Sequence, residues 1–162
     1  MIIHHSHNEF TKGRGAQFNP KNRFLKGEYV QEHIEGIDDW EREERKTEYI
    51  LDESKTIVNE VKSPDVGMSF SLNPYQGCEH GCIYCYARNS HEYWGYSAGV
   101  DFESRIVVKH NAPKVLRKFF ENKNWQPAPI SLSGNTDCYQ PIERKMKLTR
   151  QLLEICLEFR NP

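Results

Sequence analysis

Three cysteines within one short loop constrain this chain more than any other feature. Cys78, Cys82 and Cys85 form a C-x3-C-x2-C pattern, and Gly77 and Gly81 lie in the same loop. Such a loop can wrap three thiolates around one face of a cubane iron–sulfur cluster, because glycine permits positive φ angles and close backbone approach. A [4Fe–4S] cluster held this way keeps one iron without a protein ligand, and that iron can bind a small molecule.

Length and composition limit the class of protein. The chain has 162 residues and a formal net charge of −1, which suits one modest domain. It has no apolar run long enough to span a membrane and no signal-peptide core, so we expect a cytoplasmic protein with reduced thiols. Three of the five cysteines cluster, which favours metal binding over a disulfide framework. Basic residues are interleaved with acidic ones, so no basic stripe for nucleic acid is present.

Two regions of different character follow one another along the chain. Residues 1–54 show little periodicity and predict an irregular, extended leader, so the folded domain is expected at residues 55–162. Within that domain we predict strands at residues 55–59, 68–72, 104–109 and 130–133. The cysteine loop follows the second strand directly. It is therefore expected at the C-terminal end of a strand, where β/α barrels carry their chemistry.

Two helices are predicted between and after these strands. Asn111 can cap a helix at residues 112–122, with Pro113 in its first turn. Pro141 opens a longer helix. The apolar stripe of that helix comprises Ile142, Met146, Thr149, Leu152, Leu153, Cys156 and Phe159. Strands and helices alternating in this way begin a parallel βαβα series, so the expected fold class is α/β.

The cysteine pattern, with Tyr84 just before the third cysteine, resembles the cluster motif of the radical SAM superfamily. The longer stretch at residues 73–88, NPYQGCEHGCIYCYAR, resembles the spore photoproduct lyase-like branch. Within that branch it is most similar to bacterial radical SAM proteins of unassigned substrate. Residues 133–141 (SGNTDCYQP) and 14–23 (RGAQFNPKNR) resemble the same group. The similarity extends over roughly residues 14–160.

The resemblance implies a fold. A radical SAM core is a partial (β/α)6 barrel, and the chain after Cys85 has room for about two such units. We therefore expect the N-terminal part of such a barrel, in a chain that is the N-terminal portion of a larger protein or a truncated one. On this expectation the chain alone is a poor catalyst.

The resemblance also implies cofactors and residue roles. Cys78, Cys82 and Cys85 would ligate a [4Fe–4S] cluster whose open iron binds S-adenosylmethionine (SAM), the source of a 5′-deoxyadenosyl radical. Tyr84 occupies the aromatic position that lies against the adenine. The polar segment after the strand at 130–133 replaces the superfamily's usual Gly-Gly-Glu and would receive the methionyl ammonium. Its candidate acceptors are Ser133, Asn135, Thr136 and Asp137. The implied partner is an electron donor such as flavodoxin or ferredoxin, and DNA is a substrate by analogy only.

Other interpretations of the same residues remain open. The three cysteines with His80 or His91 could form a Cys3His zinc site in a small binding module. The chain could also be an inactive fragment, and residues 133–137 could be an ordinary Asx turn. Cys138 lies near the strand end where spore photoproduct lyase carries its hydrogen-atom donor, or it is a small buried residue.

Overall fold

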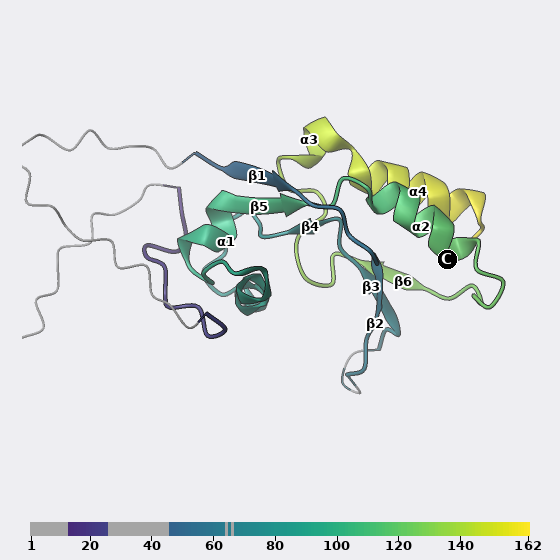
Figure 1. Ribbon diagram of the computed structural model, residues 1–162, viewed down its shortest axis with the longest axis horizontal. Helices are drawn as coiled ribbons and strands as arrows, with labels where there is room; N and C mark the ends of the chain where they lie inside the picture. Colours follow the sequence, from purple (N-terminus) through teal and green to yellow (C-terminus); the bar gives the residue numbers. More distant parts are fainter. Residues whose placement is uncertain (1–12, 26–45, 64, 66) are drawn as a thin grey trace, which may run out of the picture.

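Two small mixed sheets form the centre of the molecule (Figure 1). The computed structural model describes residues 13–25, 46–63, 65 and 67–162. The first sheet has the order β1-β5-β4, from β1 (Glu48–Leu51), β5 (Arg105–Val108) and β4 (Tyr75–Gln76). The second has the order β2-β3-β6, from β2 (Val58–Glu60), β3 (Phe70–Leu72) and β6 (Ile130–Leu132). The predicted α/β class is therefore confirmed in its general form.

Each sheet combines parallel and antiparallel pairing. In the first sheet β1 is parallel to β5, whereas β4 is antiparallel to β5. In the second sheet β3 is parallel to β6 and antiparallel to β2. We expected consecutive strands to form one parallel series. This expectation is wrong for β5, which lies in the first sheet. As a result, β3 and β6 are direct neighbours in the second sheet. The edge of β3 is already occupied by β6, and β5 instead pairs with β1 from the segment expected to be an irregular leader.

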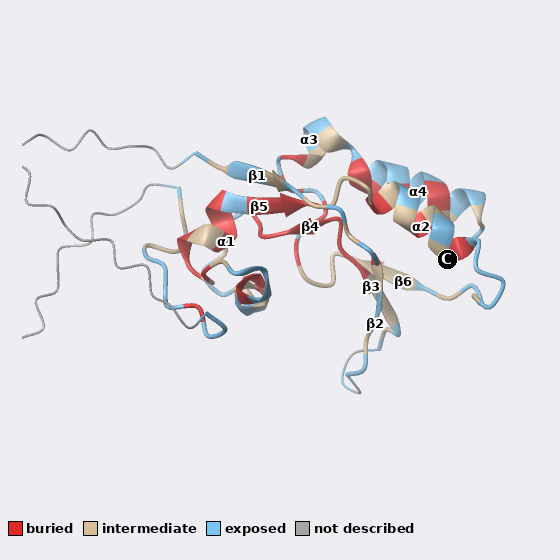
Figure 2. Cartoon of the chain, in the orientation of Figure 1, coloured by how far each residue is buried: buried red, intermediate tan, exposed pale blue. Residues whose placement is uncertain are grey.

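The main core lies between the second sheet and two helices. These are α2 (Ala112–Phe120) and α4 (Leu148–Glu158), which run side by side in Figure 1. The buried members of this core are Ile57, Leu72, Ala112, Leu116, Phe120, Leu152 and Ile155. Figure 2 shows the same alternation of buried and exposed faces along both helices. The predicted helix at 112–122 is confirmed, although the Asn111 side chain bonds the backbone of Ser54 and does not cap α2.

The long helix expected after Pro141 is broken in two. A short helix, α3 (Glu143–Met146), ends at Lys147, which adopts the left-handed conformation with φ 51° before α4 begins. The Glu143 carboxylate accepts the backbone N–H groups of Thr149 and Arg150, which belong to the first turn of α4. Because of this break, the residues of α4 that face the core differ from the apolar stripe expected from the sequence. Leu153 is exposed, and Ile155 takes its place in the core.

Two helical elements lie between the cysteine loop and β5, where no element was predicted. They are a 3-10 helix, η1 (Tyr86–Trp94), and the short helix α1 (Val100–Ser104). Ala87 from η1 and Phe102 from α1 pack against Cys78, and Cys85 joins them. The cysteine loop therefore has a small apolar core of its own. In the described parts of the chain, no helix has the length and apolar character needed to cross a membrane.

Candidate functional site around the cysteine loop

The parallel pair β3–β6 brings two predicted motifs to the same place. Leu72 and Leu132, the last residues of the strands, are register partners, so the loops that follow leave the sheet at the same edge. The side-chain oxygen of Asn73 accepts the backbone N–H groups of Asn135 at 3.0 Å and Thr136 at 3.4 Å. The segment after β6 is therefore bound directly to the chain that leads into the cysteine loop.

The backbone of the cysteine loop depends on a glycine at its start. Gly77 has φ +83°, and a Cβ there would lie 2.9 Å from the carbonyl oxygens of both Phe102 and Arg105. The next backbone N–H, that of Cys78, donates to the Phe102 carbonyl at 2.8 Å. Only glycine fits this close approach without displacing backbone. The glycine inferred from sequence thus serves both a positive φ and a tight contact.

The three thiols differ in environment. Cys78 is buried, whereas Cys82 and Cys85 are half-buried. Burial raises the pKa of the Cys78 thiol, and hydrogen bonds from the backbone N–H groups of His80 and Asp137 to the sulfur act in the opposite direction. Such bonds favour a thiolate. In the part of the chain that the structure describes, no three His, Cys, Asp or Glu side chains are grouped so that they could hold a metal ion.

The two histidines considered as zinc ligands have other neighbours. His80 Nε2 lies 2.9 Å from Asp137 Oδ2, so this side chain bridges the cysteine loop and the segment after β6. His91 is completely buried, with its ring centroid 5.2 Å from that of Tyr96 and 5.6 Å from that of Phe102.

The predicted SAM-binding residues after β6 lie together but are engaged within the protein. Asn135 Nδ2 donates to Gln76 Oε1 and to Ser90 Oγ, both at 3.0 Å. Thr136 Oγ1 donates to the Tyr75 carbonyl at 2.7 Å. These two side chains therefore fix the loop against β4 and η1.

The other members of this segment are less enclosed. Ser133 has φ +65°, and its hydroxyl oxygen accepts the N–H of Cys138, which is itself buried. Asp137 Oδ1 accepts the N–H of Tyr139 at 2.8 Å, yet the Asp137 side chain remains 44% exposed. Tyr84 is 86% exposed, and hydrogen bonding to Cys82 raises the pKa of its hydroxyl. Asp137 and Tyr84 are thus the predicted site residues most open to a ligand.

Sequence analysis did not identify Glu103, which supports the cysteine loop together with Arg88. Arg88 Nε and Nη2 both donate to the Cys82 carbonyl, at 3.1 and 2.9 Å, and Arg88 also forms an ion pair with Glu103. The fully buried Glu103 carboxylate accepts the N–H groups of Gly15 and Ala16, each at 2.9 Å. Arg88 and Gly15 belong to two of the motifs that carry the family resemblance, and that shared membership was the available signal. Glu103 lies outside every motif.

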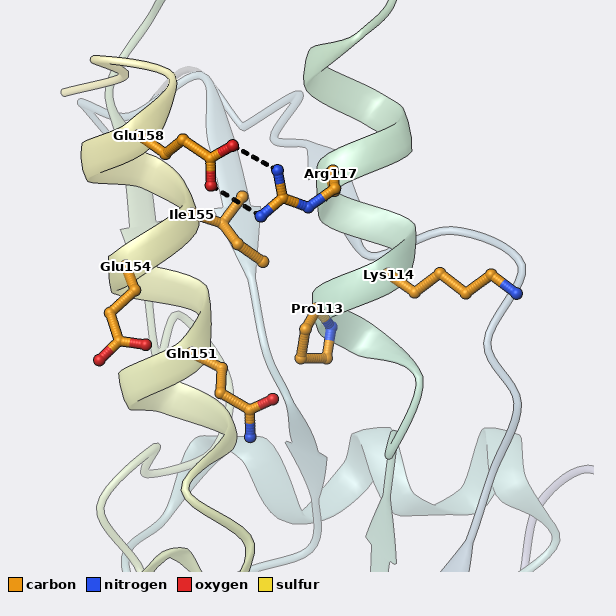
Figure 3. A pocket seen from close by; sticks show the side chains of 7 residues that line it. All are labelled: Pro113, Lys114, Arg117, Gln151, Glu154, Ile155 and Glu158. Atoms are coloured by element: carbon orange, nitrogen blue, oxygen red, sulfur yellow. Dashed lines mark hydrogen bonds and ion pairs between the residues drawn. The ribbon is translucent and has the colours of Figure 1, made fainter.

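A surface cavity lies elsewhere, between α2 and α4 (Figure 3). It is lined by Pro113, Lys114, Arg117, Gln151, Glu154, Ile155 and Glu158. The Arg117 guanidinium bonds both oxygens of Glu158 across it, at 2.5 and 2.7 Å. None of the residues predicted for cluster or SAM binding lines this cavity, so it is separate from the cysteine loop.

Comparison with known proteins finds relatives of uncharacterized function. Uncharacterized proteins of Mycobacterium bovis and Mycobacterium tuberculosis are each 37% identical over 95 residues, which is 58% of this chain and 28% of theirs. An uncharacterized protein of Methanocaldococcus jannaschii is 36% identical over 109 residues, 67% of this chain and 38% of its own. The chain therefore spans well under half the length of these relatives. No family model and no solved structure matches it.

Proposed function

We propose that this chain carries the cluster- and SAM-binding segment of a radical SAM protein of the spore photoproduct lyase-like type. One observation carries the proposal. The segment at residues 133–137 is hydrogen-bonded to Asn73, which leads into the three-cysteine loop, and Asp137 lies 2.9 Å from His80 within that loop. The two motifs were predicted separately and meet beyond the ends of the parallel strands β3 and β6. In this proposal β3, α2 and β6 belong to a partial (β/α)6 barrel, and β5 does not lie between them.

The donor set suits a cluster better than a single ion. A tetrahedral zinc site needs four donors directed at one point. Three thiolates that each ligate a separate iron do not converge on one point, so the lack of a single-ion group among the described residues is compatible with the cluster. Cys78, Cys82 and Cys85 would be the ligands. Burial raises the pKa of the Cys78 thiol, and the two backbone N–H groups directed at its sulfur offset only part of that rise.

The chain's own residues would bind and orient SAM. When bound, a reduced [4Fe–4S] cluster with an open iron supplies the electron that cleaves SAM to a 5′-deoxyadenosyl radical. The half-exposed Asp137 carboxylate is suited to accept the methionyl ammonium, and the exposed Tyr84 ring to lie against the adenine. Asn135 and Thr136 hold the loop in place through their bonds to Gln76 and Tyr75. Electrons would come from a carrier such as flavodoxin or ferredoxin.

Anaerobic reconstitution with iron and sulfide tests this proposal. We expect about four irons per chain, a visible absorption band, and an EPR signal of the reduced protein that changes when SAM is added. Cys78→Ser, Cys82→Ser and Cys85→Ser should each abolish the signal. Cys156→Ser, which changes a half-buried thiol on α4, is the matched control and should retain it. Stoichiometric zinc in the isolated protein, or no iron uptake, would overturn the proposal.

A further inference from the structure

A buried ion pair joins the cysteine loop to a segment far away in the sequence. Glu103 is fully buried and the Arg88 side chain is only 12% exposed. On one side, Arg88 donates two hydrogen bonds to the Cys82 carbonyl. On the other side, Glu103 receives one backbone N–H on each carboxylate oxygen, from Gly15 and Ala16. The charges are thus compensated, and removing either partner would leave the other buried and unpaired.

Residues 14–23, which we call the N-terminal strap, lie directly against the cysteine loop. A Cβ on Gly15 would lie only 1.8 Å from the carbonyl oxygen of Gly81. The Arg14 guanidinium bonds Thr47, whose hydroxyl in turn donates to Glu79 inside the loop at 2.9 Å. Further along the strap, the carbonyl of Phe18 accepts the N–H of Val100. The strap therefore contacts the turn that carries Cys82 at the neighbouring residues Gly81 and Ile83.

We propose that Glu103 and Arg88 are positioning residues that hold the Cys82–Cys85 turn and the N-terminal strap in one arrangement before any cluster binds. Two groups outside the pair are bonded to it: the strap amides of Gly15 and Ala16, and the Cys82 carbonyl. A cluster that meets the loop then finds two of its ligands already placed, which lowers the ordering cost of binding. The role in cluster binding rests on the proposed function. The restraint on the Cys82–Cys85 turn does not, because it needs only the chain itself.

A second ion pair provides a matched control. Glu92, also buried, pairs with Arg23 at 2.6 Å and accepts the Arg23 backbone N–H at 3.1 Å. It therefore ties the same strap to η1 through a buried glutamate and an arginine, although the Arg23 side chain is 60% exposed. Among the described residues, neither Glu92 nor Arg23 forms a hydrogen bond to the cysteine loop, whereas Arg88 bonds the Cys82 carbonyl directly. A general loss of stability should follow from changing either pair, and loosening of the Cys82–Cys85 turn only from changing the Glu103–Arg88 pair.

The experiment measures thiol alkylation in the metal-free protein. Iodoacetamide modification rates of Cys82 and Cys85 are followed by peptide mass spectrometry, with Cys156 as the internal reference. Glu103→Gln keeps the shape of the side chain but removes its charge, and Arg88→Lys keeps the charge but not the two-nitrogen fork. We expect both to raise the rates at Cys82 and Cys85 about 5- to 30-fold relative to Cys156. Glu92→Gln should leave these ratios unchanged, with all melting temperatures recorded.

The outcomes separate this inference from the proposed function. Equal acceleration by Glu92→Gln and Glu103→Gln, or no acceleration by Glu103→Gln and Arg88→Lys, would overturn the positioning role. If Glu103→Gln fails to fold, Arg88→Lys decides the question alone. A second arm records iron per chain after reconstitution, which should fall in Glu103→Gln and stay at the wild-type value in Glu92→Gln. If the wild-type chain takes up no iron, the cluster proposal fails while the alkylation ratios still decide the positioning role.

Discussion

The side-chain oxygen of Asn73 lies 3.0 Å from the backbone nitrogen of Asn135, which is 62 positions later in the chain. This hydrogen bond crosses from the end of β3 to the loop after β6, and it ties together the two motifs predicted to bind one cofactor. Asn73 is buried, so few water molecules can replace the bond when it is removed.

Asn73→Ala should therefore destabilise the fold. The change leaves the N–H groups of Asn135 and Thr136 without their acceptor, and we expect the free energy of unfolding to fall by about 1–3 kcal/mol. Urea denaturation followed by circular dichroism measures it. Asn122→Ala removes an asparagine bond within an exposed turn and should change stability by less than about 0.5 kcal/mol. Equal effects of the two changes would contradict the role assigned to Asn73.

Gly15→Ala should release the N-terminal strap. A Cβ at this position would meet the Gly81 carbonyl at 1.8 Å, and backbone on either side must move to relieve the clash. We expect faster limited proteolysis near residues 14–23 and a loss of about 1–3 kcal/mol in stability. Gly67→Ala is the control, since nothing lies within 4 Å of a Cβ there. Unchanged proteolysis of Gly15→Ala would show that the strap does not depend on this contact.

Burial of His91 should make the protein less stable in acid. Burial lowers the pKa of His91 from 6.5 to about 4, and the charge of Asp101 acts in the opposite direction. The unfolded chain then binds a proton between pH 6.5 and 4 that the folded chain does not bind. Stability contributed by neutral His91 is therefore complete above pH 6.5 and is lost as the pH falls toward 4.

His91→Leu should remove this part of the acid sensitivity. The backbone of Asp101 and of Arg105 lies near the His91 ring, but neither ring nitrogen forms a well-aligned hydrogen bond among the described residues. The apolar replacement should therefore cost little stability. Urea midpoints at pH 7 and pH 4.5 should converge in this variant. His110→Leu, at a side chain that is 36% exposed, should keep the wild-type difference between the two midpoints. If the two urea midpoints differ in His91→Leu as much as in the wild type, His91 is not the source of the acid sensitivity.

Leu152→Ala should show that α4 holds the main core together. Leu152 is fully buried between α4 and α2, and truncation leaves a cavity that costs about 2–5 kcal/mol. Leu157, on the same helix, is 79% exposed. Leu157→Ala should change the free energy of unfolding by less than about 0.5 kcal/mol. Thermal and urea unfolding of both variants test whether the face of α4 that carries Leu152 is the one packed in the core.

Much of the local structure could be predicted because it depends on neighbouring residues. Alternation of apolar and polar residues located β3, short apolar segments located β5 and β6, and helical spacing with Pro113 located α2. The prediction of one long helix after Pro141 is wrong because Lys147 adopts a left-handed conformation. The Glu143 carboxylate then accepts backbone N–H groups at the start of the new helix α4. The spacing of apolar residues in this segment does not predict such a break. The predicted metal and SAM ligands stay predictions, while the structure brings their two segments together.

Local sequence patterns were sufficient to select the residues proposed to bind the cluster and SAM, and to place the ends of β3 and β6 before them. Three clustered thiols, a glycine before them and polar residues after a second strand are all local signals. The folded molecule was needed to see that β3 pairs directly with β6, that β5 pairs with β1, and that Glu103 is buried. These outcomes depend on contacts between residues tens of positions apart. Such contacts form only where burial and hydrogen bonding in the whole fold offset the entropy of closing long loops.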